Sequence, residues 1–230
     1  MSEQGDRASF LAGIRQRTAG PVVAGPHPRP APRADAPGVR FTVLDGVDVD
    51  DRGALLRCFM TTAEAATVAV HPTPAATVPP ELLAGIVADH GVGRAVLSAE
   101  SEAQGCRGVL AALGVAVDDH DGAATAAAAD LGVTSAVAAV AATGSIVVSS
   151  AAARGRTASL LPRVHLCVVP VDRLVATPAD VLRGRTHPPP SNLVFITGPS
   201  RTGDIEQVMT LGVHGPTAVH VIVTAAPAPS

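Results

Sequence analysis

The sequence predicts an α/β fold in which helices cover both faces of a mainly parallel, partly mixed β-sheet. Two observations carry this prediction. Short and almost wholly apolar segments such as 95-AVL-97, 164-VHLCVV-169 and 218-AVHVIVT-224 have the composition of strands buried on both faces. Between such segments lie stretches whose apolar residues recur at helical spacing. Strands that alternate with amphipathic helices in this way indicate a layered α/β domain.

The first 40 of the 230 residues differ from the rest. Residues 6–17 can form one short amphipathic helix, and six prolines follow within residues 18–38. Because proline at that density neither continues a helix nor joins a central strand, we expect an extended linker there. The predicted organisation is an N-terminal helix and linker over 1–40, partly disordered, and one α/β domain over 41–230.

Helical spacing recurs through the predicted domain, and most repeats have a recognisable start or end. Pro79 or Pro80 can open one helix that Gly91 ends, and Thr177 is an N-cap followed by Pro178. The expected helices cover Leu55–Ala63, Pro80–His90, Cys106–Leu113, the Ala-rich stretch up to Gly132, Pro178–Arg183 and a segment from about Asp204.

Apolar runs of strand length fill the intervals. The segments 133-VTSAVAAV-140 and 145-SIVVS-149 lie so close together that they predict an antiparallel hairpin, with Thr143 and Gly144 at its turn. The remaining expected strands are 68-VAV-70, 95-AVL-97, 115-VAV-117, 164-VHLCVV-169, 193-LVFIT-197 and 218-AVHVIVT-224.

Composition excludes several kinds of chemistry. All 17 basic residues are Arg, so no lysine can form a Schiff base or contact a phosphate in a P-loop. The net charge of −3 and the absence of Trp and Tyr argue against nucleic-acid binding. We expect a cytoplasmic protein, since no signal peptide and no apolar run of membrane-spanning length are present.

The three cysteines, Cys58, Cys106 and Cys167, form no C-x-x-C pair. Their apolar neighbours predict buried, reduced thiols, and their spacing fits no iron–sulfur cluster. The histidines show no metal-ligand spacing, so no metal site is expected. His165 alternates with apolar residues on a probable central strand, which predicts a hydrogen-bonded core histidine.

The strongest local motif is 193-LVFITGPSRTGDIEQV-208, a predicted strand, a Gly-rich loop and a predicted helix start. If the strand ends at the carboxyl edge of the sheet, Gly198, Ser200, Arg201 and Thr202 would face an anion at the helix N-terminus. The alternative is structural, because Thr202 or Gly203 can cap the helix while acidic residues complement its dipole.

A second motif, 212-GVHGP-216, places His214 beside Gly215 in a tight loop. His214 can act as an acid, a base or a hydrogen-bond donor near neutral pH, or it can fix the turn through a backbone hydrogen bond. Arg201 and His214 are the candidate catalytic residues, since a purely structural interpretation explains them least well.

A third motif, 143-TGSI-146, offers Thr143, Gly144 and Ser145 as donors to a carboxylate or phosphate. A plain hairpin turn explains the same residues. Neither a G-x-S-x-G elbow nor a dinucleotide-binding glycine fingerprint is present, so the sequence shows binding loops without a complete catalytic constellation.

Taken in order, 143-TGSI-146, 159-SLLPRVHLCVV-169, 197-TGPSRTGDIE-206 and 212-GVHGP-216 resemble the LUD-domain family of lactate-utilization proteins over roughly residues 130–224. The resemblance implies a three-layer α/β/α sandwich like that of the NagB/RpiA/CoA-transferase group. One departure stands out, because Ala142 occupies a place where the family usually has an acidic residue.

The resemblance also implies a role in oxidising L-lactate to pyruvate. This chain would be the subunit without redox centres and without a cofactor of its own, which binds a small anionic molecule or docks to iron–sulfur partner subunits. The alternative is an independent enzyme acting on a phosphate- or CoA-containing substrate, as related folds do, with Arg201 and His214 holding and protonating it.

Overall fold

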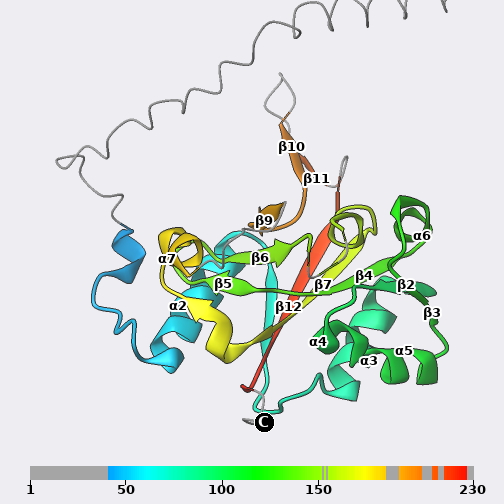
Figure 1. Ribbon diagram of the computed structural model, residues 1–230, viewed down its shortest axis with the longest axis horizontal. Coiled ribbons are helices and arrows are strands. Elements are labelled where there is room, and N and C mark those ends of the chain that lie inside the picture. The colour runs from blue at the N-terminus through cyan, green and yellow to red at the C-terminus, as the bar shows by residue number, and fades with distance from the viewer. Residues whose placement is uncertain are drawn as a thin grey trace, which may run out of the picture. The chain divides into compact units, whose positions relative to one another are not determined.

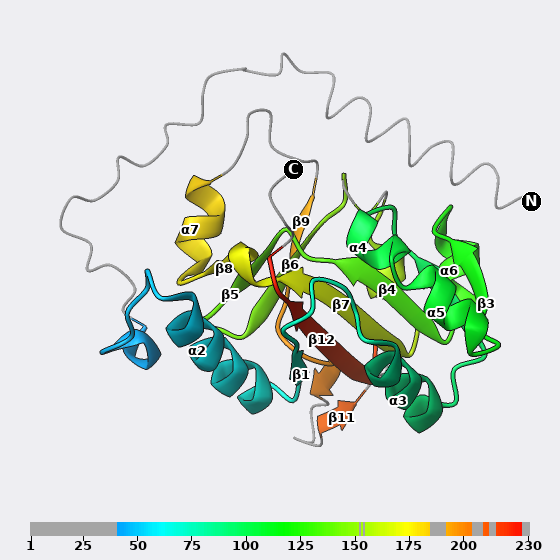
Figure 2. The same cartoon turned by 90° about the horizontal axis from the view of Figure 1, so that it is seen from below.

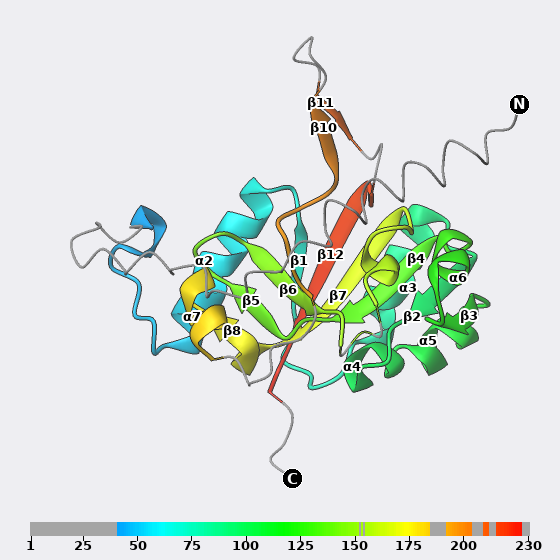
Figure 3. The same ribbon diagram turned by 45° about the horizontal axis from the view of Figure 1, so that its top comes forward.

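The structure, a computed structural model, describes residues 41–151, 153, 155–184, 192–203, 209–211 and 215–226, with only the backbone described for 201–203 and 209–211. Its centre is a six-stranded, wholly parallel sheet in the order β1-β12-β7-β4-β2-β3 (Figures 1 and 3). The strands are β1 (Ala69–Pro72), β2 (Arg94–Leu97), β3 (Ala116–Asp119), β4 (Leu131–Ser135), β7 (Val164–Pro170) and β12 (Ala218–Thr224).

One face of this sheet is covered by α3 (Pro80–His90), α4 (Ser101–Gln104) and α5 (Arg107–Ala112) (Figure 2). Their apolar side chains pack with alternate residues of the central strands. Burying this surface contributes roughly 25 cal/mol per Å² of apolar area. The fully buried members of this layer include Leu83, Leu97, Leu110, Leu131, Leu166 and Ile222.

The opposite face packs against α2 (Arg52–Ala65) and a second sheet of four strands. A smaller apolar cluster on the same face joins the parallel sheet to α6 (Ala123–Ala127) and the 3-10 turn η2 (Thr157–Ser159). The second sheet has the order β8-β5-β6-β9. Its strands are β5 (Ala138–Val140), β6 (Ser145–Ser149), β8 (Leu174–Val175) and β9 (Leu193–Ile196). The α/β class is therefore confirmed, with flanking helices on a parallel sheet.

The predicted hairpin is confirmed, but its first strand is divided. Residues 133–140, expected as one strand, split into the end of β4 in the parallel sheet and β5 in the second sheet. β5 and β6 pair antiparallel around the turn that contains Gly144, whose φ of 65° favours glycine. The mixed pairing that we expected within one sheet is confined to the second sheet.

Local capping signals predicted several helix ends correctly. Pro80 begins α3 and Gly91 ends it in the left-handed conformation, at φ 56° and ψ 48°. At the start of the helix α7 (Pro178–Arg183), Asp180 Oδ2 accepts the Thr177 N–H at 2.8 Å and the Thr177 hydroxyl at 2.7 Å, as in a capping box. Asp51 caps α2 by accepting the Gly53 N–H at 2.8 Å.

Two expectations for the C-terminal third were wrong. The strand 193–197 does not join the parallel sheet, because β9 pairs antiparallel with β6. The helix expected from about Asp204 is contradicted at Met209–Leu211, which forms β11 and pairs antiparallel with β10 (Arg201–Gly203); the two strands project together (Figure 3). The acidic residues that suggested a helix dipole lie between these strands, outside the described residues.

The Ala-rich helix is also shorter than predicted. α6 ends at Ala127, and Gly132, expected to terminate that helix, lies inside β4. A β-carbon at Gly132 would lie 1.8 Å from the Ala158 carbonyl oxygen, so glycine is needed there for η2 to approach the sheet. Residues 1–40 lie outside the described residues, and the predicted division of the chain near residue 40 stays a prediction.

Candidate functional site

The loop 143–145 forms a chain of hydroxyl groups. Thr143 Oγ1 lies 2.7 Å from Ser145 Oγ, which lies 2.7 Å from Thr197 Oγ1. Ser145 is only 3% exposed. The structure therefore joins the predicted 143–145 loop to the start of the predicted 197–200 loop, although 52 residues separate Ser145 from Thr197.

Both Thr-Gly pairs pack against one helix end. A β-carbon on Gly144 would lie 2.4 Å from the backbone nitrogen of Ala63, and one on Gly198 would lie 2.3 Å from the Ala66 carbonyl oxygen. Gly198 also has a φ of 100°, which other residues rarely adopt. The two glycines thus let two loops approach the C-terminal end of α2.

The 212–216 motif meets the loop that follows β9. The Ser200 N–H donates to the Pro216 carbonyl at 2.9 Å, and a β-carbon on Gly215 would lie 3.0 Å from Ser200 Cβ. The Thr217 N–H donates to the Arg163 carbonyl just before β7. All three motifs therefore gather at the amino edge of the parallel sheet, which corrects our expectation that 197–200 lies at its carboxyl edge.

The two candidate catalytic residues are only partly placed. Arg201 and Thr202 lie on β10, where Arg201 aligns with Leu211, but their side chains lie outside the described part of the chain. His214 lies wholly outside the described residues. Their roles in ligand binding or catalysis stay predictions.

A second polar group lies at the opposite, carboxyl edge of the sheet, where sequence reasoning had placed nothing. Leu97 of β2 aligns with Asp119 of β3 and with Val133 of β4. Backbone hydrogen bonds extend both pairings by one residue: the His120 N–H donates to the Leu97 carbonyl, and the Ser98 N–H donates to the Val133 carbonyl. The next residues, His120, Ser98 and Thr134, therefore stand side by side on three neighbouring strands, all under 8% exposed.

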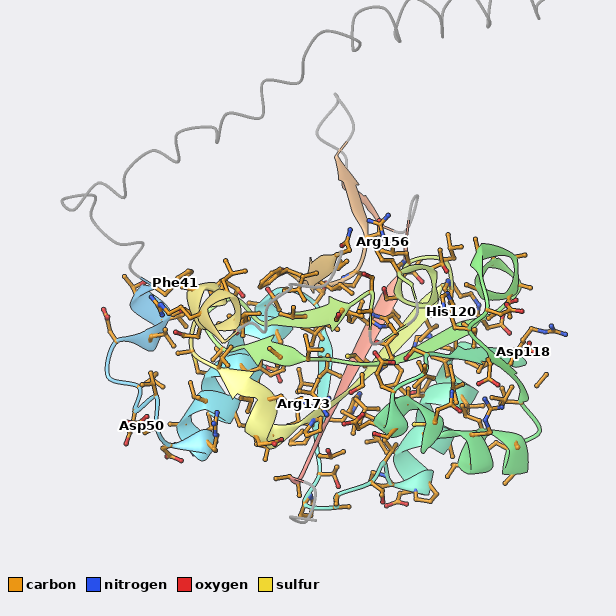
Figure 4. The ribbon with its side chains drawn as sticks, viewed as in Figure 1. Phe41, Asp50, Asp118, His120, Arg156 and Arg173 are labelled. Carbon is orange, nitrogen blue, oxygen red and sulfur yellow. The ribbon has the colours of Figure 1, made fainter. Side chains whose placement is uncertain are left out.

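Charged side chains adjoin this row. The Ser98 hydroxyl donates to Glu100 Oε2, and Arg173 forms an ion pair with Glu102. Arg173 Nη1 also donates to Ser135 Oγ at 3.0 Å and to the Ala136 carbonyl at 2.8 Å. We call Ser98, Glu100, Glu102, His120, Thr134 and Arg173 the carboxyl-edge cluster; Figure 4 labels Arg173 and His120.

Burial shapes the electrostatics of this cluster. It raises the pKa of Glu100, despite the hydrogen bond from Ser98. Burial also opposes the charge of Glu102, but its backbone hydrogen bond and Arg173 together hold the Glu102 pKa below its usual range. Burial lowers the pKa of His165 to about 4, and its Nε2 lies 2.9 Å from Thr134 Oγ1, which confirms the predicted core histidine.

Three buried side-chain atoms among the described residues lack a hydrogen-bond partner, namely Glu100 Oε1, His120 Nδ1 and His165 Nδ1. Glu100 and His120 belong to the carboxyl-edge cluster, whereas His165 is the second residue of β7 and lies near the amino ends of the strands. His120 instead uses Nε2, 2.6 Å from Thr157 Oγ1 on η2. Because more than nine in ten buried polar groups are normally paired, two unpaired atoms in one cluster make it a candidate functional surface.

An apolar hollow of about 330 Å³ opens farther along the same edge, at the ends of β1 and β12. Val171 lines it, and Val171 and Arg173 share the 3-10 turn η3 (Val171–Arg173). The carboxyl edge therefore carries a polar part over β3, β2, β4 and β7 and an apolar part over β12 and β1.

Three histidines that are distant in the sequence also meet. His220 Nδ1 lies 3.1 Å from His71 Nε2, and His220 Nε2 lies 2.8 Å from His90 Nε2. Burial, with the neighbouring histidines, lowers the pKa of His220 to about 4. Across the described ranges, no three His, Cys, Asp or Glu side chains are arranged to hold a metal ion.

Comparison with known proteins identifies the family. The sequence profile of the LUD domain matches residues 59–224, most of the chain. The chain belongs to the LUD domain family. The match includes both the amino-edge motifs and the whole parallel sheet, and so confirms the resemblance seen in the sequence.

Curated members of the LUD domain family resemble the chain over shorter stretches. Lactate utilization protein C of Shouchella clausii is 38% identical over 96 residues, which cover 38% of this chain and 41% of that protein. Its counterpart in Anoxybacillus flavithermus is 32% identical over 154 residues, covering 63% of this chain and 69% of that one. In the Shouchella alignment the chain thus spans less than half of its relative's length.

A solved structure also resembles the fold. The crystal structure of a DUF162 family protein from Deinococcus radiodurans superposes with a TM-score of 0.52 at 25% identity, covering 76% of this chain and 98% of that one.

Ala142, where we expected an acidic residue in the LUD family, is 8% exposed and packs among Ala138, Val140 and Val147. In the part of the chain that the structure describes, no helix is long and apolar enough to span a membrane.

The carboxyl-edge cluster was missed for an identifiable reason. Its signal in the sequence was a polar residue directly after an apolar strand at Ser98, a histidine after the two aspartates that end β3 at His120, and a hydroxyl within β4 at Thr134. Such residues occur at most strand ends. Only the register showed that they align on one face.

Proposed function

We propose that this protein is the component without redox centres of an L-lactate utilization system in the cytoplasm, where it binds a small anionic molecule or docks to iron–sulfur partner proteins. The LUD domain match over residues 59–224 carries the proposal, together with relatives named Lactate utilization protein C. Those names indicate a role in growth on L-lactate.

The state of the cysteines supports the assignment of clusters to partners. Cys58, Cys106 and Cys167 are all buried free thiols. Burial raises the pKa of Cys106 and of Cys167 to about 12, so these thiols stay protonated at neutral pH. A cluster needs thiolate ligands. Electron transfer in the proposed system therefore passes through other subunits.

Deletion of the gene tests the proposal. The deletion strain should grow slowly or not at all on L-lactate, grow normally on pyruvate, and recover when the full chain is expressed from a plasmid. Normal growth of the deletion strain on L-lactate would overturn the proposal.

Association with partners is a separate readout. Affinity purification of the tagged full-length chain from lactate-grown cells should recover proteins with the visible absorption of iron–sulfur clusters. The same purification from a strain that lacks those partners is the control. Recovery of the chain alone, with normal lactate growth, contradicts the docking role.

A further inference from the structure

The carboxyl edge between β2 and β4 is the topological switch point of the sheet. From β2 the chain moves outward to β3, and from β3 it returns to β4 on the other side of β2. The connection through α4 and α5 packs on one face, while α6 packs on the other. In open α/β sheets, ligands bind at such a crevice beyond the carboxyl ends of the strands.

The residues at this switch point are polar and incompletely paired. Ser98 and Thr134 are 0% and 1% exposed, and their hydroxyls bond Glu100 and His165. Glu100 Oε1 is buried without a partner among the described residues. The Arg173 and Glu102 side chains stay 32% and 19% exposed, so the cluster is accessible from the edge.

Arg173 retains capacity to bind an oxyanion. Three hydrogen bonds hold its two Nη groups to Ser135, Ala136 and Glu102. A guanidinium has five N–H groups, so two remain for another acceptor. Because Glu102 already balances its charge, the site favours a ligand with a single negative charge over a dianionic phosphate.

The neighbouring groups specify a second polar atom on the ligand. Glu100 is the N-cap residue of α4, whose first turn carries Glu102, the ion-pair partner of Arg173. A carboxyl group at that place can donate to or accept from a hydroxyl or oxo oxygen. No Phe, Tyr or Trp side chain belongs to the cluster, so a nucleotide base or CoA adenine has no large stacking platform there.

We propose that the carboxyl-edge cluster binds a small 2-hydroxy- or 2-oxo-monocarboxylate, with Arg173 on the carboxylate and Glu100 on the adjacent hydroxyl or oxo oxygen. This assignment rests on the proposed function for its class of metabolite, and it places the ligand at the opposite edge of the sheet from the predicted 143–145 and 197–200 loops.

Calorimetry on the full-length protein with L-lactate and with pyruvate tests the site. Glu100→Gln should weaken the binding of at least one of them by about tenfold or more, the effect of one lost charged hydrogen bond. Glu64→Gln makes the same chemical change on an exposed part of α2 and should leave affinity unchanged. If neither compound binds the wild type, or if Glu100→Gln binds as tightly as Glu64→Gln, the inference is overturned.

Amide chemical-shift mapping of the wild type avoids dependence on any variant's folding. Ligand should shift the amides of residues 98–102 and 134–137, while 143–145 and 197–200 stay unchanged. Shifts confined to 143–145 and 197–200 would overturn this site, yet leave the lactate-utilization role intact. A deletion strain that grows normally on L-lactate would instead remove the proposed function without deciding where a carboxylate binds.

Discussion

A β-carbon on Gly144 would overlap the backbone of Ala63, lying 2.4 Å from its nitrogen and 2.5 Å from its α-carbon. The turn of the β5–β6 hairpin is therefore in direct backbone contact with the C-terminal end of α2. A second Thr-Gly pair, at Thr197 and Gly198, approaches the same helix end, and Ser145 hydrogen-bonds Thr197 across the gap. This arrangement fixes two loops that the sequence predicted to bind an anion.

Gly144→Ala should destabilise the protein by about 3 kcal/mol or more, because the new methyl group meets rigid backbone and alanine disfavours a φ of 65°. Urea unfolding measures the change. Gly85→Ala, within α3 and with nothing inside 4 Å of the added carbon, should instead stabilise by about 0.5–1 kcal/mol. Equal effects at the two glycines would contradict the contact.

His165 should make the fold acid-sensitive. Its pKa of about 4 in the folded state lies below that of an unfolded histidine near 6.5, so the unfolded chain binds the proton first. The contribution of His165 to the free energy of unfolding is complete above about pH 6.5 and is lost as pH falls toward 4. Its size is on the order of 3 kcal/mol.

The measurement is the free energy of unfolding at pH 7, 6, 5 and 4 for wild type and His165→Gln. The wild type should lose stability more steeply than the variant across this window. Parallel curves would show that His165 does not carry the dependence.

Glu100→Gln should raise stability at neutral pH. Burial raises the Glu100 pKa, so ionising it costs the folded state more than the unfolded state. The stability advantage of the glutamine variant grows as pH rises from the pKa of the unfolded carboxyl, near 4, toward the higher pKa of the folded state. In acid the advantage disappears. Thermal melts at pH 3 and pH 7 check this, and a variant less stable than wild type at pH 7 would contradict it.

Asp130→Asn should cost about 1 kcal/mol near pH 6. Asp130 Oδ2 accepts the N–H groups of Gly93 and Arg94 at 2.9 and 3.0 Å, and Oδ1 meets Arg163 at 3.4 Å. Partial burial opposes its charge, but these bonds hold the Asp130 pKa below its usual value. The benefit is therefore present above about pH 4 and disappears as pH falls through the folded pKa.

Urea unfolding at pH 6 and pH 2.5 separates these two regimes. Asp172→Asn, on the exposed face of η3, is the matched control and should change little at either pH. A cost that persists unchanged at pH 2.5 would mean that the carboxylate charge is not what Asp130 contributes.

Arg201→Ala distinguishes the alternative enzyme role from the accessory role. If a phosphate- or CoA-containing substrate binds at the amino edge, calorimetry should detect CoA or inorganic phosphate in the wild type and at least tenfold weaker binding in Arg201→Ala. Failure of both compounds to bind, or equal binding by the variant, would eliminate that alternative. Arg183→Ala, an exposed arginine paired only with Asp180 among the described residues, is the control.

The sequence by itself determined the α/β class, most strand positions and several helix ends. Apolar runs gave β6, β7 and β12 almost residue for residue, because buried strands need continuous apolar side chains. Pro80, Gly91 and Thr177 marked helix boundaries because their backbone preferences act locally.

Only the tertiary structure decided which strands pair. The composition of 193–197 fits either sheet, and pairing with β6 instead of the parallel sheet moved the following loop from the carboxyl to the amino edge. Register likewise brought Ser98, His120 and Thr134 onto one face, although these residues are far apart in the sequence and belong to no recognisable motif. Strand pairing is a long-range interaction, so the location of a site at either edge could not be read from local sequence.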